Sequence, residues 1–261
     1  MLTAAQASAA QRTLVMVATY NERDNLEALL ERIWSAADVD VLVIDDSSPD
    51  GTGDLADLVA ARDPRLCVVH RASKGGVASA HRLAFHHALD KGYARVVEMD
   101  ADFSHAPEDL PALIAATPVH GVALGSRCAP GAAIMGRSGW RNLLTRAGGA
   151  YARAVLGLRV RDCTGGFRCT SAAALRAVDV DAIESRGYGF QLELNWAWKR
   201  AGVEVVEVPI VFRDRTVGVS KMSFAILAES LAMVVRLRTG RVPCAARDAT
   251  LPARAVLRAE Q

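Results

Sequence analysis

Short apolar runs alternate with segments of helical periodicity through the first half of this chain, and the alternation limits its possible folds more than any other feature. The runs have the length of strands, and the segments between them place apolar residues three and four positions apart, as amphipathic helices do. Strands that are apolar throughout are typical of a parallel sheet with helices on both faces. The expected strands are 13–18, 39–44, 66–70, 95–99 and 122–125, and the expected helices are 25–37, 53–62, 77–89 and 107–116. The sequence therefore predicts an α/β fold with a mostly parallel central sheet.

The second half of the chain has a more mixed pattern. Its expected elements are helices at 142–156, 190–201 and 223–238, a turn and strand over 162–169, and a strand over 203–212. With 261 residues, 51% of them hydrophobic, the chain can bury one sizeable core. We therefore expect a flexible N-terminus over 1–12, one α/β domain over 13–222, an amphipathic helix over 223–240 and a flexible tail over 241–261.

Charge and cysteine content exclude several classes of protein. The 31 lysines and arginines nearly balance the 29 acids, so the net charge of +2 gives no reason to expect a nucleic-acid partner. The five cysteines include no C-x-x-C pair, which disfavours a zinc site or a disulfide framework and fits a reducing compartment. The sequence has no signal-peptide pattern and no run of about 20 apolar residues that would span a membrane. A cytoplasmic protein is expected.

An acidic pair, Asp100 and Asp102, follows the apolar run 96–99 at the expected end of a strand. Two carboxylates at this spacing can both approach one divalent cation if the chain turns there. Hard oxygen ligands suit Mg²⁺ or Mn²⁺, which usually also bind substrate phosphates. Such a pair is also common in ordinary polar loops. Its place after a buried strand favours a metal site, because open α/β sheets bind ligands at the carboxyl ends of their strands.

Two more polar segments follow expected strands. The segment 45–51, D-D-S-S-P-D-G, has acids that can bind ribose hydroxyls or base N–H groups, although the same residues also favour a helix-capping turn. The segment 19–22, T-Y-N-E, has an aromatic ring and a carboxylate that can hold a nucleobase, and taken alone it is as typical of a simple turn. The third glycine of a dinucleotide-binding loop is missing after Gly51 and Gly53, which argues against hydride transfer.

Seven segments in order, from Val17 to Ser223, resemble the family 2 glycosyltransferases, and among them the polyprenol-phosphate (dolichol-phosphate) mannose synthases. The segments are V-A-T-Y-N-E-R-D-N-L, V-I-D-D-S-S-P-D-G-T-G, E-M-D-A-D-F-S-H-A-P, L-G-S-R, D-C-T-G-G-F-R, G-Y-G-F-Q-L-E-L and S-K-M-S. The resemblance covers most of the chain. It implies the GT-A (nucleotide-diphospho-sugar transferase) fold, with a mostly parallel central sheet and flanking helices.

The resemblance also implies a role for individual residues. The nucleotide sugar is expected to contact Thr19, Tyr20, Glu22, Asp46, Lys74, Asp100 and Ala101, and Mg²⁺ or Mn²⁺ is expected on Asp100 and Asp102. The acceptor phosphate is expected to contact Arg127, Arg137, Arg215, Lys221 and Gln191. The expected catalytic residues are Asp102, Arg127 and Arg215. Apart from the resemblance, His105 stands beside the acidic pair, where it can support the metal ligands from behind; a structural role is favoured over a catalytic one.

The implied reaction is an inverting transfer of mannose from GDP-mannose to a polyprenyl (dolichyl-type) monophosphate, which gives polyprenyl phosphate mannose and GDP. A phosphate monoester has a second pKa of about 6, so it is a competent nucleophile at neutral pH. The enzyme then needs positioning and charge neutralisation more than a general base. Two alternatives stay open at this point: a UDP-glucose-dependent polyprenyl-phosphate glucosyltransferase, and a nucleotide-binding module without catalysis.

A lipid acceptor requires contact with a membrane surface. The apolar stretch 222–235 is too short to span a bilayer, and basic residues follow it at 236, 238 and 241. It can lie in the membrane interface or pack on the protein's own core, and periodicity does not separate these alternatives. We expect a peripheral protein at the inner face of the membrane. A membrane-anchoring partner protein is an alternative route to the lipid.

Overall fold

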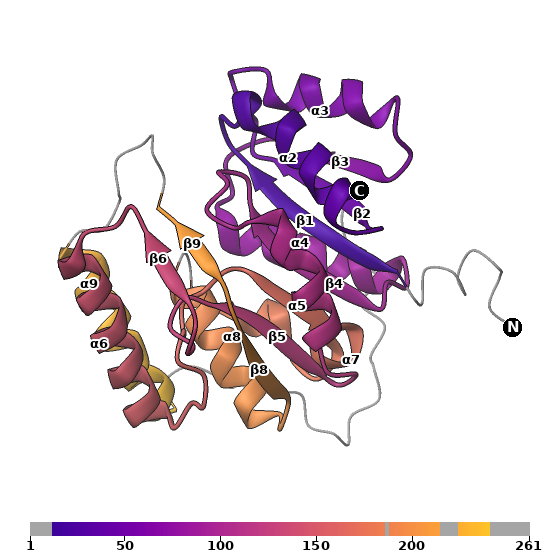
Figure 1. Ribbon diagram of the computed structural model, residues 1–261. Coiled ribbons are helices and arrows are strands. Elements are labelled where there is room, and N and C mark those ends of the chain that lie inside the picture. The colour runs from indigo at the N-terminus through magenta and orange to yellow at the C-terminus, as the bar shows by residue number, and fades with distance from the viewer. Residues whose placement is uncertain (1–11, 186–187, 215–223, 241–261) are drawn as a thin grey trace, which may run out of the picture.

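A seven-stranded sheet forms the centre of the protein in a computed structural model that describes residues 12–185, 188–214 and 224–240 (Figure 1). Its strand order is β3-β2-β1-β4-β7-β5-β8, and only β7 runs antiparallel to its neighbours. The strands are β1 (Thr13–Thr19), β2 (Asp40–Asp45), β3 (Leu66–His70), β4 (Arg95–Asp100), β5 (Gly121–Ser126), β7 (Arg168–Ser171) and β8 (Glu204–Pro209). The mostly parallel central sheet predicted from the sequence is confirmed.

Helices cover both faces of this sheet. They are α2 (Arg23–Ala36), α3 (Thr52–Ala60), α4 (Val77–Asp90), α5 (Leu110–Ala116), α6 (Gly139–Leu156), α7 (Ala172–Arg176), α8 (Tyr188–Arg200) and α9 (Phe224–Arg238), with short 3₁₀ turns η1 (Pro107–Asp109) and η2 (Val180–Ala182). None of the helices in the described ranges is both long and apolar enough to cross a membrane. The ends of the chain, 1–11 and 241–261, lie outside the described residues.

The inner strands form where they do because alternate residues find apolar cover on opposite faces. Leu14 and Met16 of β1 belong to a buried cluster that includes Phe85 of α4. Val15 and Val17, between and after them, belong to a second cluster on the other face, which α2 and α5 complete. Strand residues buried on both sides explain why these runs are apolar throughout.

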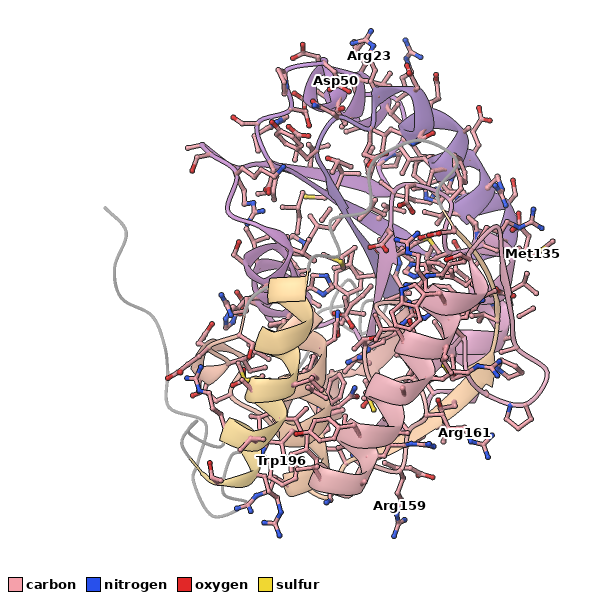
Figure 2. All side chains as sticks on the ribbon, turned by 90° about the vertical axis from the view of Figure 1, so that its left-hand side faces the viewer. Arg23, Asp50, Met135, Arg159, Arg161 and Trp196 are labelled. Carbon is pink, nitrogen blue, oxygen red and sulfur yellow. The ribbon has the colours of Figure 1, made fainter. Side chains whose placement is uncertain are left out.

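A third cluster joins α9 to α6 and α8. Met233, Val234 and Leu237 of α9 are buried in it, so part of this helix packs on the protein's own core. Leu231 and Val235 of the same helix are 39% and 48% exposed. Figure 2 shows α6 and α9 side by side on one face of the molecule. The described part of α9 therefore has one apolar face in the core and further apolar residues at the surface.

The prediction of a single strand over 203–212 is wrong. It divides at Ile210 into β8 and a second strand, β9 (Val211–Arg213), which pairs in parallel with β6 (Ala133–Met135) in a separate two-stranded sheet. Pro209 has no N–H to continue the ladder, so the chain can leave the main sheet there. The strand β6 and the helix α7 were not expected, and α6 begins at Gly139 and not at residue 142.

A layer of buried charge lies under the end of β4. Glu98 of β4 and Arg168 of β7 face each other in register, and both are fully buried. His81 from α4 and Gln191 from α8 both hydrogen-bond to Glu98 Oε1. Burial lowers the pKa of Arg168, and the nearby Glu98 charge opposes that shift. Because Glu98 precedes Asp100 by two residues, this layer anchors the strand that ends in the acidic pair.

Candidate active site

The carboxyl ends of four parallel strands meet at one edge of the sheet, and the polar motifs follow these ends. Thr19 at the end of β1 lies opposite Asp45 at the end of β2, and Ala18 lies opposite Asp100 at the end of β4. The strand β5 runs in the same direction, because β7 pairs antiparallel with both β4 and β5. Ligands of open α/β sheets bind outside this edge. The fold thus brings the three predicted motifs and Arg127 to one edge.

Backbone strain is concentrated in the loops at this edge. Among the described residues, the non-glycine positions with positive φ are Asn21, Ser47 and Phe103, at 60°, 58° and 59°. They follow β1, β2 and β4, respectively. A left-handed conformation at such a residue costs roughly 1–2 kcal/mol, and it is found mainly where function requires a particular loop shape. The three loops are therefore shaped at some cost in stability.

The first motif presents an aromatic ring beside a cation. Tyr20 is 39% exposed, and Lys74 Nζ lies 3.4 Å from the centroid of its ring. Thr19 points inward, where its Oγ1 donates a hydrogen bond to Asp45 at 2.9 Å. Glu22 ends the motif immediately before α2. The exposed ring and the amine stand together at the edge, an arrangement that suits a planar, negatively charged ligand such as a nucleotide.

The second motif is tied to the loop after β3 by an arginine that the sequence analysis missed. Arg71 pairs with the buried carboxylate of Asp46, and it also donates to Ser79 and to the Gly76 carbonyl. The Gly76 N–H donates to the other oxygen of Asp46 at 3.3 Å. Arg71 is the first residue after β3, and this position at the end of a strand is the sequence feature that could have identified it. Asp46 therefore also fixes the loop that carries Lys74.

The acidic pair lies at the end of β4 with its carboxylates in different surroundings. The side chain of Asp100 is 48% exposed. Asp102 is partly buried, and its Oδ1 accepts a hydrogen bond from the Ser104 N–H at 3.0 Å. Within the described ranges, no three His, Cys, Asp or Glu side chains gather to hold a metal by themselves. Mg²⁺ is usually bound by one or two carboxylates together with substrate phosphates, so this pair fits a cation that is shared with a diphosphate.

His105 is buried directly behind the acidic pair. Its ring stacks on Phe167 with centroids 4.9 Å apart and meets the edge of Phe212 at 5.9 Å. Its Nδ1 accepts a hydrogen bond from the Asp100 N–H at 3.1 Å. Burial lowers the pKa of His105, although the charge of Asp100 opposes the shift. The ring is therefore neutral at neutral pH, and its proton is on Nε2.

The guanidinium of Arg127 is held by Asp162, which the sequence analysis did not single out. Nε and Nη2 of Arg127 donate to the two carboxylate oxygens, each at 2.7 Å. Burial raises the pKa of Asp162, but the hydrogen bonds and charge of Arg127 outweigh it, so that pKa lies below its usual value. Arg127 also lies over the Phe212 ring, 5.2 Å from its centroid. The pair fixes one arginine at the edge in one orientation. Asp162 is the first residue of the segment D-C-T-G-G-F-R, and its place in that segment is the sequence feature that could have identified it.

The other predicted acceptor residues are more dispersed. Arg137 lies just before α6, and its Nη1 donates to Thr145 at 3.1 Å. Gln191 is 5% exposed and belongs to the buried charge layer, where it donates to Glu98. Two of the predicted residues, Arg215 and Lys221, lie outside the described residues. Their roles and that of Gln191 stay predictions.

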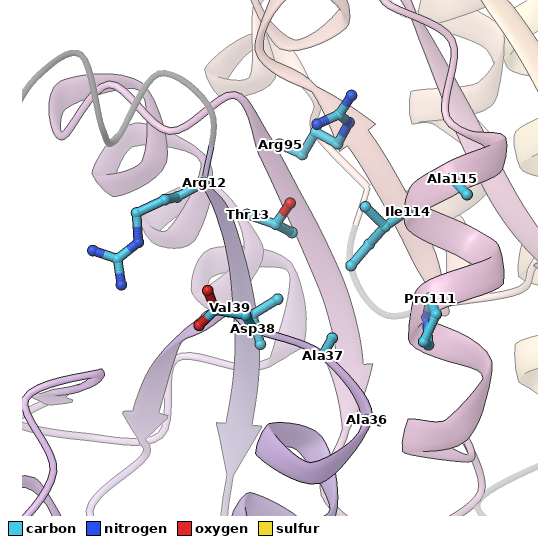
Figure 3. Close-up of a pocket in the computed structure, with 10 residues that line it drawn as sticks. All are labelled: Arg12, Thr13, Ala36, Ala37, Asp38, Val39, Arg95, Pro111, Ile114 and Ala115. Atoms are coloured by element: carbon cyan, nitrogen blue, oxygen red, sulfur yellow. The ribbon is translucent and has the colours of Figure 1, made fainter.

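A hollow of about 530 Å³ lies at the opposite edge of the sheet (Figure 3). Arg12 and Thr13 at the start of β1, Arg95 at the start of β4 and Ile114 of α5 line it. None of the predicted site residues does. Since the ligand edge of such a sheet is the carboxyl edge, we assign no substrate to this hollow.

Comparison with known sequences matches the chain to one protein family and to relatives that are more than 40% identical to it. The profile of the family described as Glycosyl transferase family 2 matches residues 14–179, a range that includes the acidic pair and Arg127. An undecaprenyl-phosphate mannosyltransferase of Micrococcus luteus is 46% identical over 226 residues, which cover 86% of this chain and 93% of that protein. A polyprenol monophosphomannose synthase of Mycolicibacterium smegmatis is 44% identical over 227 residues, which cover 86% of each.

Solved structures share the fold at low sequence identity. A glucosyl-3-phosphoglycerate synthase from Mycobacterium tuberculosis, in complex with Mn²⁺, UDP-glucose and glycerol 3-phosphate, has a TM-score of 0.61 and 20% identity; the match covers 94% of this chain and 84% of that one. A mannosyltransferase from Pyrobaculum calidifontis, in complex with GDP-mannose and Mn²⁺, has a TM-score of 0.55 and 21% identity, with 92% and 66% covered. The expected fold is confirmed by these likenesses.

Proposed function

Because the chain belongs to glycosyltransferase family 2 and has the GT-A fold, we propose that it transfers mannose from GDP-mannose to a polyprenyl monophosphate. The observation that carries the proposal is the meeting of Asp100 and Asp102 with the Asp162-held Arg127 at one edge of the sheet. The relatives named for mannosyl transfer to undecaprenyl phosphate and for polyprenol monophosphomannose synthesis support this choice of sugar and acceptor.

On the donor side, Tyr20 and Lys74 receive the nucleotide, and Asp46 with Arg71 keeps the Lys74 loop in place. Asp100 and Asp102 are the residues that would hold a divalent cation, Mg²⁺ or Mn²⁺, for the diphosphate. When bound, the cation supplies charge stabilisation to the departing nucleoside diphosphate. The Mn²⁺ in the two solved structures of the same fold supports a cofactor of this kind.

On the acceptor side, an oxygen of the lipid phosphate attacks the anomeric carbon of mannose. The new carbon–oxygen bond forms on the face opposite the diphosphate as the bond to GDP breaks, so the configuration inverts and an α-linked donor gives a β-linked product. Arg127, with Arg137, Arg215 and Lys221, neutralises the acceptor phosphate, which would otherwise be repelled by the diphosphate. No general base is needed, because the phosphate is largely dianionic at neutral pH.

The test is incubation with radiolabelled GDP-mannose, a polyprenyl phosphate and Mg²⁺ or Mn²⁺. The expected product is a labelled lipid that is stable to alkali and labile to acid, together with GDP. Labelled UDP-glucose serves as the competing donor, and labelled lipid from it in place of GDP-mannose would assign the sugar to glucose. Nucleotide binding without any labelled lipid would leave a binding module and contradict the proposed reaction.

The lipid acceptor requires a membrane-facing surface, and α6 has the features of one. Its exposed residues include Trp140 and Leu143, at 69% and 61% exposure. The exposed alanines Ala147, Ala150 and Ala154 continue the same stripe at spacings of three and four. The 18 residues of α6 include three arginines and no acid. An apolar stripe on a basic helix is typical of a helix that lies on an anionic bilayer.

Beside α6, the helix α9 adds exposed Leu231 and Val235 and the basic residues Arg236 and Arg238. These two helices pack against each other in the same cluster. We therefore place the enzyme at the inner face of a membrane as a peripheral protein, with the α6 stripe as its contact. An anchoring partner protein would make this contact unnecessary.

Replacing both Trp140 and Leu143 by serine is expected to lower partition onto liposomes with anionic lipid at least tenfold. Burial of a large apolar side chain contributes about 1.5–3 kcal/mol, so losing two even partly inserted side chains exceeds the 1.4 kcal/mol of a tenfold change. Sedimentation with liposomes measures it. The matched control is Leu58→Ser with Val119→Ser, which removes two equally exposed apolar residues elsewhere, at 57% and 74%. Equal binding by both double variants and the unaltered protein would contradict the α6 contact.

A further inference from the structure

We propose that Glu207 is a positioning residue for the acceptor phosphate, because its carboxylate fixes the backbone from which Asp162 holds Arg127. The proposal rests on the proposed function, in which Arg127 neutralises that phosphate, and it adds a residue to which that function gave no role. The observation is a pair of hydrogen bonds. Glu207 Oε2 accepts from the Arg161 N–H at 2.9 Å, and Glu207 Oε1 accepts from the Asp162 N–H at 3.0 Å.

The segment that carries Asp162 joins α6 to β7 over residues 157–167 and has no helix or strand of its own. Asp162 and Cys163 within it are nevertheless only 1% and 2% exposed. Buried backbone N–H groups need partners, and outside helices and sheets these are side chains or water. Glu207 supplies the partners of two consecutive N–H groups. The position of Asp162 therefore depends in part on a side chain of β8.

Asp162 in turn holds both the backbone and the side chain of Arg127. Its Oδ2 accepts from the Arg127 N–H at 2.9 Å and from Nε at 2.7 Å, and its Oδ1 accepts from Nη2 at 2.7 Å. The side chain of Asp162 is fully buried, and that of Arg127 is 12% exposed. Charged hydrogen bonds at two atoms of a guanidinium fix its direction as well as its place. A displacement of Asp162 would therefore turn the guanidinium away from the acceptor phosphate.

The sheet places Glu207 beside the strand that leads to Arg127. The strands β5 and β8 pair in parallel, with Glu207 opposite Leu124, and Arg127 directly follows the last residue of β5. Side chains on strands are positioned more precisely than side chains on loops. Glu207 therefore fixes a segment outside the sheet relative to the end of β5, where Arg127 lies.

Glu207→Gln tests this role with little change of side-chain size. The glutamine amide has one acceptor oxygen and one donor group, so its donor would face one of the two backbone N–H groups. We expect kcat/KM for the polyprenyl phosphate to fall about tenfold, less than the roughly hundredfold that a misplacement of about 1 Å can cost. The dissociation constant of GDP should stay unchanged. Glu204→Gln, at an exposed acid of the same strand, is the matched control and should transfer at the normal rate.

A double-mutant cycle tests whether Glu207 acts through Arg127. The effects of residues in one hydrogen-bond network do not add, whereas those of independent residues do. In the Arg127→Lys background, Glu207→Gln is therefore expected to lower kcat/KM for the acceptor by about twofold or less. A second full loss there, unchanged kinetics in Glu207→Gln alone, or an equal loss of GDP affinity would overturn the proposal. No transfer from GDP-mannose by the unaltered enzyme would instead overturn the proposed function on which it rests.

If Glu207→Gln does not fold, amide hydrogen exchange in the unaltered protein decides. The Arg161 and Asp162 amides are expected to exchange slowly, since each donates to Glu207. Saturation with a short-chain polyprenyl phosphate should slow them further, together with the Arg127 amide, because a ligand stabilises the local structure that binds it. Rapid exchange at Arg161 and Asp162, or exchange there that the acceptor leaves unchanged while the Arg127 amide slows, would refute the positioning role.

Discussion

Asp102→Asn is expected to lose about a hundredfold to a thousandfold in the rate of mannosyl transfer, the loss typical of removing one group that stabilises transition-state charge. The substitution keeps an oxygen that can accept from the Ser104 N–H, as Asp102 Oδ1 does at 3.0 Å. It removes the negative charge that the cation requires. Because the local turn keeps its hydrogen bond, the melting temperature should stay within a few degrees. Asp102→Ala should lose transfer equally and the turn hydrogen bond as well.

The measurement is single-turnover transfer from labelled GDP-mannose, with Mn²⁺ binding followed in parallel. Asp90→Asn, an exposed acid at the far end of α4, is the matched control and should transfer at the normal rate. Near-normal transfer by Asp102→Asn at saturating Mg²⁺ would show that the acidic pair does not hold the catalytic cation. A large fall in melting temperature with proportional loss of activity would point to a structural role.

Arg127→Lys is expected to reduce kcat/KM for the lipid phosphate about a hundredfold while GDP binding stays nearly unchanged. A lysine keeps the charge but has no planar fork to engage a carboxylate at two atoms, so it cannot reproduce the two 2.7 Å hydrogen bonds to Asp162. The ammonium is then free to take other directions, and the acceptor phosphate loses a fixed cation. A bidentate charged contact is among the stronger hydrogen-bonded pairs in proteins, which is why the expected loss is large.

Steady-state kinetics with varied acceptor, and GDP binding by calorimetry, separate the two substrates. The control is Arg62→Lys at an exposed position after α3, which should behave as the unaltered enzyme. An unchanged kcat/KM for the acceptor would remove Arg127 from the acceptor site. Equal losses for donor and acceptor, together with a lower melting temperature, would mean that the Arg127–Asp162 pair supports the fold alone.

The local pattern of the sequence was enough to predict the parallel part of the fold. The strands β1 to β5 and helices α2 to α5 coincide with the expected segments to within a few residues. Strands buried on both faces of the sheet, such as β1 and β2, form continuous apolar runs that are easily recognised. The misses are in the second half. The split between β8 and β9 depends on Pro209 and on pairing with β6, whose three residues are too short to leave a periodic signal.

The motifs of the site could be predicted from the sequence, but the ion pairs between its residues could not. The acidic pair and the Tyr20 motif follow strands in sequence, so their place at the carboxyl edge follows from the topology. The partners of Asp46 and Arg127, by contrast, are 25 and 35 residues away along the chain. Only the folded sheet brings such residues together. The same holds for Gln191, whose burial against Glu98 no local pattern reveals.

The three left-handed residues after β1, β2 and β4 set a limit for anyone who wishes to make this enzyme more heat-resistant. Substitutions chosen for ideal loop geometry would be drawn first to Asn21, Ser47 and Phe103, since relaxing them recovers energy. Those positions lie in the turns of the proposed substrate site, so stability gained there is expected to lower turnover. The amino edge of the sheet, around Arg12 and Arg95, is the safer place to begin.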